Sequence, residues 1–166
     1  MPGSLVDVPC LRPVEPGDEP FLRSVYASTR AAELEQVPWT AEQKALFCDS
    51  QFTAQDTHYR SHFTQAQYYV IEQRGIAIGR LYVDRSPVDI NILDIALLPA
   101  YCGAGLGTFL LRQLMDEAAA SGKKVSIYVE KFNPAMTLYQ RLGFQEVADV
   151  GVYLSMQWLP GAAQPR

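Results

Sequence analysis

Short runs of β-branched and aromatic residues recur along the chain, and each of these runs predicts a strand. The run at 68–71 is followed by Gly75 and by a second run at 76–83, so these two segments are expected to form a hairpin. The nearly continuous apolar run at 90–98 has the length of a strand covered on both faces, and we expect it to lie centrally in the sheet. The remaining strands are predicted at 8–14, 125–129, 144–147 and 152–158.

Two helices are predicted between the first strand and the hairpin. Asp18 precedes the first helix and is expected to cap it, and the helix is expected to end near Leu34. Thr40 with Gln43 three residues later has the spacing of a capping box, which predicts the start of a second helical region. Apolar and polar residues are mixed in this region to about Phe63, so the region could form either one continuous helix or a helix with a break.

Two further helices are predicted in the second half of the chain. Apolar residues recur every four positions over 106–118, which predicts a helix with one buried stripe that stops at Gly122. Asn133 is expected to cap the last helix, with Pro134 at its first position and Gly143 at its end.

In order, these segments read β-α-α-β-β-β-α-β-α-β-β. This order predicts an α+β (mixed α/β) fold with one central mixed, mostly antiparallel sheet and helices on both faces. The length of 166 residues suits a single domain over 1–166, with an ordered core at about 8–158. Hydrophobic residues make up 48% and charged residues 19% of the chain, which is ordinary for a globular protein and disfavours disorder and coiled coils.

The charge balance and the cysteines narrow the class of protein. A net charge of −4 disfavours a surface that follows nucleic-acid phosphates, because such surfaces cluster Lys and Arg. Cys10, Cys48 and Cys102 have no short paired spacing, which fits reduced thiols. Because we find neither a membrane-spanning apolar run nor a signal-peptide pattern, we expect a cytoplasmic protein without nucleic-acid or membrane partners.

A glycine cluster at Cys102–Thr108 lies between a predicted strand and a predicted helix. Backbone N–H groups in such a loop, together with the helix N-terminus, form a concave anion site that glycine keeps open, so we predict a ligand with a pyrophosphate. A Rossmann fingerprint would need glycine where Thr108 stands, and a P-loop would need a lysine after the glycines. A glycine-rich turn that only reverses the chain is the structural alternative.

Two motifs in this region resemble a known family. The run from Ile95 through Leu111, followed by Asn133-Pro134-Ala135 and by 138–144, is similar to the two signature motifs of the GCN5-related N-acetyltransferase (GNAT) superfamily. The predicted order of elements also matches that fold over nearly the whole chain. The resemblance implies an acetyl-CoA-dependent N-acetyltransferase, an acyltransferase that passes the acetyl group to a primary amine by direct attack in a ternary complex.

The resemblance also implies a cofactor site for acetyl-CoA. The strand at 95–97 would pair its backbone with the pantetheine arm, and the glycine loop would bind the pyrophosphate through its N–H groups. Family members usually carry Arg or Gln where this chain has Cys102, so main-chain groups are expected to carry the binding. The implied cofactor-binding residues are Ile95, Ala96, Leu97, Cys102, Gly103, Ala104, Gly105, Leu106, Gly107, Thr108, Asn133 and Tyr139.

Tyr139 is the candidate catalytic residue. Its helical spacing from Ala135, Leu138 and Leu142 predicts that it faces the sheet, where it could simply be a core aromatic. The resemblance implies a general acid instead: a phenol with a pKa of about 10 can protonate a departing thiolate whose acid has a pKa of about 8.5.

The sequence does not identify a general base. Asp94 interrupts an apolar strand, but a symmetric hairpin about Pro87 places it opposite Arg80, so we predict a structural ion pair. Glu33 and Glu35 fall in a segment that is expected to separate the first two helices. The resemblance implies an acceptor site in this segment, so Glu33 and Glu35 are the substrate-binding candidates and could bind or deprotonate an amine, with two solvated carboxylates as the alternative.

Several alternatives stay open at this point. His58 and His62 have the spacing of a metal clip, but Tyr59 replaces the glutamate of a zinc protease motif, and no metal is expected. Cys102 is disfavoured as a covalent nucleophile, because no histidine lies near it in the sequence and direct transfer needs no acyl-enzyme.

Two other functions compete with acetyl transfer: a non-catalytic acyl-CoA sensor and a transferase that uses a longer acyl-CoA. The acceptor, a small-molecule or peptide amine, and the oligomeric state, a homodimer included, are not identified.

Overall fold

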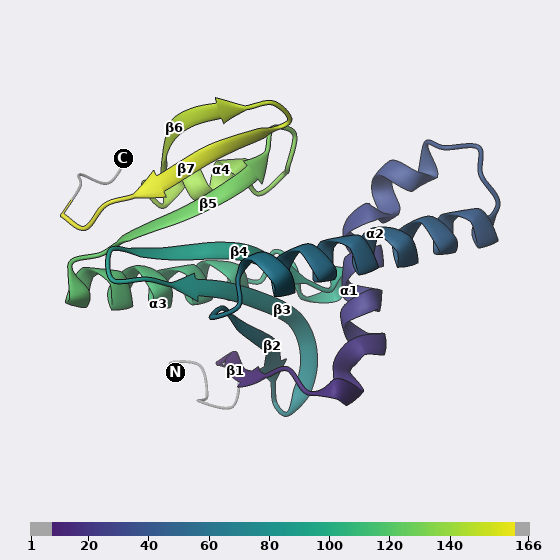
Figure 1. Ribbon diagram of the computed structural model, residues 1–166, viewed down its shortest axis with the longest axis horizontal. Coiled ribbons are helices and arrows are strands. Elements are labelled where there is room, and N and C mark those ends of the chain that lie inside the picture. The colour runs from purple at the N-terminus through teal and green to yellow at the C-terminus, as the bar shows by residue number, and fades with distance from the viewer. Residues whose placement is uncertain (1–7, 162–166) are drawn as a thin grey trace. The chain divides into compact units, whose positions relative to one another are not determined.

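The computed structural model describes residues 8–161, and within this range the strands and helices follow the predicted order (Figure 1). The helices are α1 (Glu19–Glu35), α2 (Ala41–His62), α3 (Leu106–Ser121) and α4 (Met136–Arg141), with short 3-10 turns η2 (Pro16–Asp18) and η3 (Pro99–Tyr101). The strands are β1 (Cys10–Pro13), β2 (Gln67–Gln73), β3 (Ile76–Arg85), β4 (Asp89–Leu97), β5 (Lys124–Glu130), β6 (Gln145–Val150) and β7 (Tyr153–Trp158). The predicted domain bounds, 1 and 166, lie outside the described residues.

The strands form one seven-stranded mixed sheet in the order β1-β2-β3-β4-β5-β7-β6. β4 is the fourth strand in this order, which confirms its central position. It pairs in parallel with β5, whereas β1 with β2, β5 with β7 and β6 with β7 are antiparallel. Ile90 and Ile92 are buried, but Leu93–Leu97 are all partly exposed, so β4 is not covered on both faces along its length. The apolar run therefore predicted the position of the strand correctly but overestimated the burial of its two faces.

The described chain divides into two compact units. The first comprises residues up to Tyr82 together with Asp94–Leu106, and the second comprises Val83–Leu93 together with residues from Gly107 onward. Because their boundaries fall within β3 and β4, these two strands contribute residues to both units.

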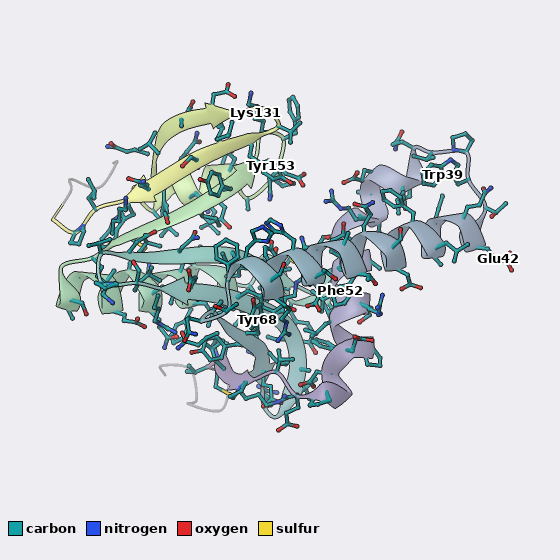
Figure 2. All side chains as sticks on the ribbon, viewed as in Figure 1. Trp39, Glu42, Phe52, Tyr68, Lys131 and Tyr153 are labelled. Carbon is teal, nitrogen blue, oxygen red and sulfur yellow. The ribbon has the colours of Figure 1, made fainter. Side chains whose placement is uncertain are left out.

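The core of the first unit lies under α1 and α2. Leu22 and Tyr26 of α1, Phe52 of α2 and Val70 of β2 form one buried cluster, and the rings of Tyr26 and Phe52 meet edge to face at 6.3 Å. Figure 2 labels Phe52 on α2 and Tyr68 on β2. Side chains from three separate elements, α1, α2 and β2, therefore define this core.

The core of the second unit is formed by the apolar stripe of α3 and by alternate residues of β5 and β7. The predicted four-residue period is confirmed by Leu110, Leu114 and Ala118, and by Leu106, which belongs to the first unit. The buried residues of this core are Leu110, Leu111, Leu114, Met115, Ala118, Val125, Ile127, Val129 and Met156. α3 ends at Ser121, one residue before Gly122, as predicted.

The capping box of α2 is confirmed. Thr40 accepts a hydrogen bond from the N–H of Gln43 at 3.1 Å, and the Gln43 side chain accepts from the N–H of Thr40 at 2.9 Å. α2 continues without a break to His62. Both groups of the box hold backbone donors that the first helical turn leaves without intrahelical partners.

The expected cap of α1 is wrong. Asp18 has helical backbone angles and does not cap; its carboxylate accepts instead from the Arg12 guanidinium at 2.7 and 2.8 Å and from the Glu15 N–H at 2.7 Å. These hydrogen bonds, above all the one from Arg12, lower the pKa of Asp18 to about 2. The helix also runs on to Glu35, so the segment expected to interrupt it begins later than predicted.

Gly79 in the middle of β3 marks a close approach of two backbones. A Cβ atom at this position would collide with the carbonyl oxygen of Ala96 and would lie 3.0 Å from the Cα of Leu97. Glycine inside a strand commonly has this role, and the neighbouring residues belong to the end of β4 that the resemblance assigns to the cofactor arm.

We expect Gly79→Ala to lower the free energy of unfolding by about 1–3 kcal/mol, the usual cost of overpacking, because backbone atoms of β4 must move. The control is Gly17→Ala, since a Cβ at Gly17 meets no atom within 4 Å. Urea denaturation of the two variants measures the difference. Equal stability of the two variants would show that β4 yields without cost at this position.

Candidate functional site

The glycine loop has the backbone geometry of an anion site. Gly103 and Gly105 have φ angles of 79° and 82°, and Ala104 between them has a negative φ, a pattern that turns successive N–H groups toward one side. A Cβ at Gly103 or Gly105 would meet no atom within 4 Å, so the space beside the backbone is open. α3 begins at Leu106, and its first N–H groups have no intrahelical partner. These residues fit a diphosphate group.

The Cys102 side chain does not take part in this geometry. Its Sγ lies 3.6 Å from the carbonyl oxygens of both Leu97 and Leu98, on the chain that leads into the loop. Cys102 is exposed and is a free thiol. The Cys102 side chain is therefore directed to the carbonyl groups that precede the loop.

In the second unit, Asn133 lies three residues before α4, and Tyr139 lies within that helix. Asn133 Oδ1 accepts from the N–H of Ala135 at 2.8 Å, but α4 begins at Met136 with Ala135 at its N-cap. The prediction that Asn133 caps this helix with Pro134 at its first position is therefore wrong, because the Asn133 side chain closes a turn that precedes the helix. Tyr139 is buried, with 4% of its surface exposed, and its ring meets Phe144 edge to face at 5.7 Å. Its predicted inward orientation is confirmed.

A buried polar cluster lies beneath α2 in the first unit. Arg80 on β3 is 2% exposed; its Nε donates to Asp94 Oδ2 on β4 at 2.5 Å, which confirms the predicted ion pair. Arg80 Nη2 also donates to Gln55 Oε1 at 2.8 Å, and its guanidinium lies 5.0 Å from the centre of the Tyr82 ring. Burial lowers the pKa of Arg80, but the charge of Asp94, the neighbouring Tyr82, the hydrogen bond to Asp94, and Tyr59 together outweigh burial and raise it.

Tyr82 belongs to this cluster and was not predicted from the sequence as a site residue. Its hydroxyl is buried, and within residues 8–161 it makes no hydrogen bond. Burial raises the pKa of the phenol. Gln55 was also missed, since one glutamine on a polar helix carries no pattern. Gly79 does carry a signal, because glycine in a strand suggests close packing of backbones.

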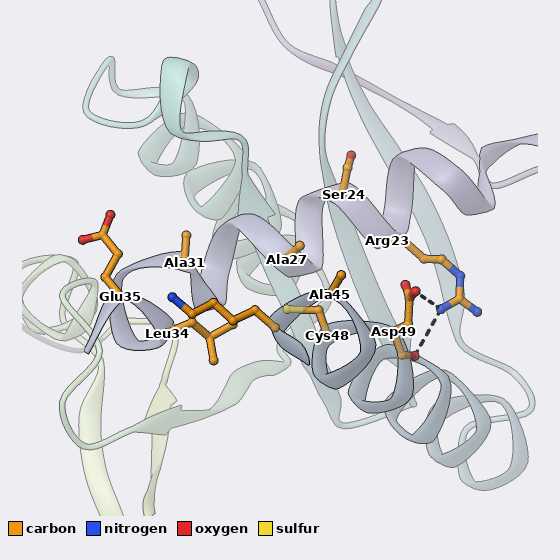
Figure 3. A pocket seen from close by; sticks show the side chains of 10 residues that line it. Arg23, Ser24, Ala27, Ala31, Leu34, Glu35, Ala45, Cys48 and Asp49 are labelled. Carbon is orange, nitrogen blue, oxygen red and sulfur yellow. Dashed lines mark hydrogen bonds and ion pairs between the residues drawn. The ribbon is translucent and has the colours of Figure 1, made fainter. Parts of the chain in front are cut away.

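The two acceptor candidates both lie in the last turn of α1. Glu33 pairs with Arg30 at 2.9 Å, one turn earlier in the helix. Glu35 lines a groove of about 470 Å³ between α1 and α2, shown in Figure 3. The groove has an apolar floor that includes Leu34 and Cys48, and burial raises the pKa of the Cys48 thiol. None of the residues predicted to bind the cofactor lines this groove.

The predicted site residues are divided between the two units. Ile95–Leu97 and Cys102–Leu106 belong to the first unit, as do Glu33 and Glu35. The remaining cofactor candidates belong to the second unit: Gly107, Thr108, Asn133 and Tyr139.

Neither a metal cluster nor a membrane span is found in the described chain. Among residues 8–161, no three His, Cys, Asp or Glu side chains gather as a metal site would require. The His62 ring nitrogen Nδ1 lies 3.0 Å from the His58 carbonyl oxygen. No helix in the same range combines the length and the apolar character needed to cross a bilayer.

Known proteins resemble this chain in sequence and in fold. Over 74 residues the chain is 34% identical to the ribosomal protein bS18-alanine N-acetyltransferase of Haemophilus influenzae, and the match covers 44% of this chain and 48% of that protein. The aligned segment thus spans about half the length of this relative.

Solved structures match over most of the chain. The PaiA N-acetyltransferase of Thermoplasma acidophilum, in complex with coenzyme A, has a TM-score of 0.68 at 15% identity and covers 91% of this chain and 98% of its own. The spermidine N-acetyltransferase of Vibrio cholerae, with coenzyme A and spermine, has a TM-score of 0.60 at 19% identity and covers 91% and 95%. At this level of identity the likeness shows the fold.

The family itself is shown by sequence. The profile of the acetyltransferase (GNAT) domain matches residues 64–146, half of the chain, and this segment includes the glycine loop, Asn133 and Tyr139. The chain is therefore a member of the GNAT acetyltransferase family.

Proposed function

We propose that this protein is an N-acetyltransferase that transfers the acetyl group of acetyl-coenzyme A to a primary amine by direct attack in a ternary complex. Membership of the GNAT family supports acetyl transfer. The observation that carries the proposal is the loop Cys102–Thr108, where two open glycines with positive φ lead into the N-terminus of α3.

Acetyl-coenzyme A, when bound, supplies the acetyl group as an activated thioester. The residues of this chain hold it and move protons. The backbone at 95–97 receives the pantetheine arm, and the N–H groups of Cys102–Thr108 bind the diphosphate. Asn133 Oδ1 already accepts from Ala135, so its amide NH₂ group is the one that donates to the arm.

Tyr139 is the proposed general acid. Tyr139 would give its hydroxyl proton to the sulfur as the amine displaces it from the acetyl carbon. The amine nitrogen would lose its own proton to solvent water, and Tyr139 would regain a proton from solvent before the next turnover. Its burial against Phe144 limits the movement of the ring, which suits a positioned proton donor.

The names of two similar proteins support an amine acceptor. One is an alanine N-acetyltransferase and the other a spermidine N-acetyltransferase. Of the two glutamates at the end of α1, Glu35 is the better candidate to meet a cationic amine, because Glu33 is already paired with Arg30.

Two measurements test the proposal together. Acetyl-CoA and CoA should each raise the melting temperature, because a ligand that binds only the folded chain stabilises it by mass action. A panel of amines and peptides should then contain acceptors that release CoA thiol. Stabilisation without release from any amine would favour a sensor, and faster release with longer acyl-CoAs would favour another acyl donor.

Gly105→Asp should weaken CoA binding about tenfold or more, because it places a carboxylate beside the loop that receives the diphosphate. Gly105→Asn is the matched control, since asparagine has nearly the same shape and tolerates the same positive φ without the charge. Calorimetric titration with CoA compares the two variants. Equal affinities of the Asp and Asn variants would place the diphosphate elsewhere.

A further inference from the structure

The strand β6 is an exposed edge of the sheet. It is the last strand in the order and pairs with β7, and all six of its residues, Gln145–Val150, are exposed. An unpaired strand edge presents a row of N–H and C=O groups that fit another extended chain. Within residues 8–161, β6 is paired on one side only, and its pairing with β7 is irregular between Glu146 and Ala148. Its capacity to receive one more strand is therefore greatest along the regular part, Ala148–Val150.

One face of β5, β7 and β6 carries exposed apolar side chains that could contact the side chains of a strand added beside β6. The register pairs Tyr128 with Ser155, and Tyr153 with both Glu130 and Val150, so these residues share one face. Tyr128 is 60%, Val150 51% and Tyr153 40% exposed, and Figure 2 labels Tyr153 on β7. The opposite face of the same strands is buried at Ile127, Val129 and Met156.

The charges beside this surface select the kind of occupant. β6 carries Glu146 and Asp149 and no basic residue. The nearby cation, Lys131, is held by Asp149 at 2.8 Å, and Glu146 makes no ion pair within the described residues. A second copy of the chain that paired β6 with β6 would bring two Glu146 carboxylates onto adjacent strands, and no ion pair offsets either of them, so like-charge repulsion disfavours this pairing. A basic strand has the opposite and favourable charge.

We propose that β6 binds an extended, basic peptide segment of a partner protein as an added strand. The backbone of the segment pairs with β6, its basic side chains meet Glu146 and Asp149, and its other side chains lie against Tyr153 and Val150. This interaction surface lies within the second unit and does not depend on the proposed acetyl transfer.

The test uses the full-length protein without acetyl-CoA and a fluorescent nine-residue peptide in which lysine and valine alternate. We expect saturable binding that weakens with salt and slows hydrogen exchange of the amides at 145–150. The same peptide with N-methylated alternate backbone amides should bind much more weakly, because it cannot pair along its length. A peptide with glutamate in place of lysine should not bind.

Glu146→Lys is expected to weaken binding about tenfold, since attraction becomes repulsion. Glu42→Lys on α2, in the first unit, makes the same charge change outside the proposed surface and should leave binding unchanged; Glu42 is exposed and is labelled in Figure 2. Equal loss in both variants, unchanged binding of the methylated peptide, or unchanged exchange at 145–150 would overturn the proposal. A dimer in sedimentation that Glu146→Lys abolishes or strengthens would also overturn it, because β6 would then be occupied by a second copy.

Discussion

Tyr139→Phe is expected to lower kcat about 10²–10⁴-fold, the usual contribution of general acid catalysis, while KM for acetyl-CoA changes little. The change removes one hydroxyl and keeps the ring that packs against Phe144, so the fold and its stability should be retained. The measurement is a steady-state assay of thiol release with the best acceptor from the amine panel.

Tyr128→Phe provides the matched control for this experiment. It removes the same hydroxyl from a tyrosine that is 60% exposed on β5 and has no proposed part in catalysis. A pre-steady-state measurement should confirm that chemistry limits turnover in the parent enzyme. If Tyr139→Phe then keeps near-normal kcat, Tyr139 is a packing residue and another group protonates the sulfur.

Asp94→Ala is expected to lower the free energy of unfolding by about 3 kcal/mol, because it leaves the buried Arg80 guanidinium without its anion. This expected loss is the lower end of the range for breaking a buried ion pair, since Gln55 still accepts a hydrogen bond from Arg80. Urea denaturation monitored by fluorescence measures the loss.

Two further variants separate the ion pair from the loss of a side chain. Glu117→Ala breaks a more exposed ion pair, in which Glu117 Oε2 lies 2.6 Å from Arg85 Nε. This change should lower the free energy of unfolding far less than Asp94→Ala does. The double variant Asp94→Leu with Arg80→Met removes both charges and should recover much of the stability. If Asp94→Ala alone costs no more than Glu117→Ala, the pair does not stabilise the fold, and Asp94 becomes a candidate base again.

Local patterns predicted most of the secondary structure, because strand and helix periodicity and capping depend on near neighbours. The capping box of Thr40 and Gln43 was predictable since both of its hydrogen bonds lie within four residues. The pair of Arg80 and Asp94 was predictable because one short hairpin turn fixes which residues of two strands meet.

The features that failed depend on partners distant in sequence or on competition between partners. Asp18 has the composition of a helix cap, but a guanidinium six residues earlier takes up its carboxylate. The contact between Gln55 and Arg80 joins residues 25 positions apart, and no sequence period links them. Motifs identified the glycine loop and Tyr139, but they contain no information on where the acceptor binds.

The hydrogen bond between Gln55 and Arg80 also limits how α2 can slide over the sheet. Apolar contacts such as those of Phe52 tolerate small translations, whereas a donor and an acceptor at 2.8 Å tolerate very little. A shift of one helical turn, about 5.4 Å, would remove Gln55 from the guanidinium and leave a buried charge short of an acceptor. One polar contact in an otherwise apolar layer thus sets the longitudinal register of a 22-residue helix.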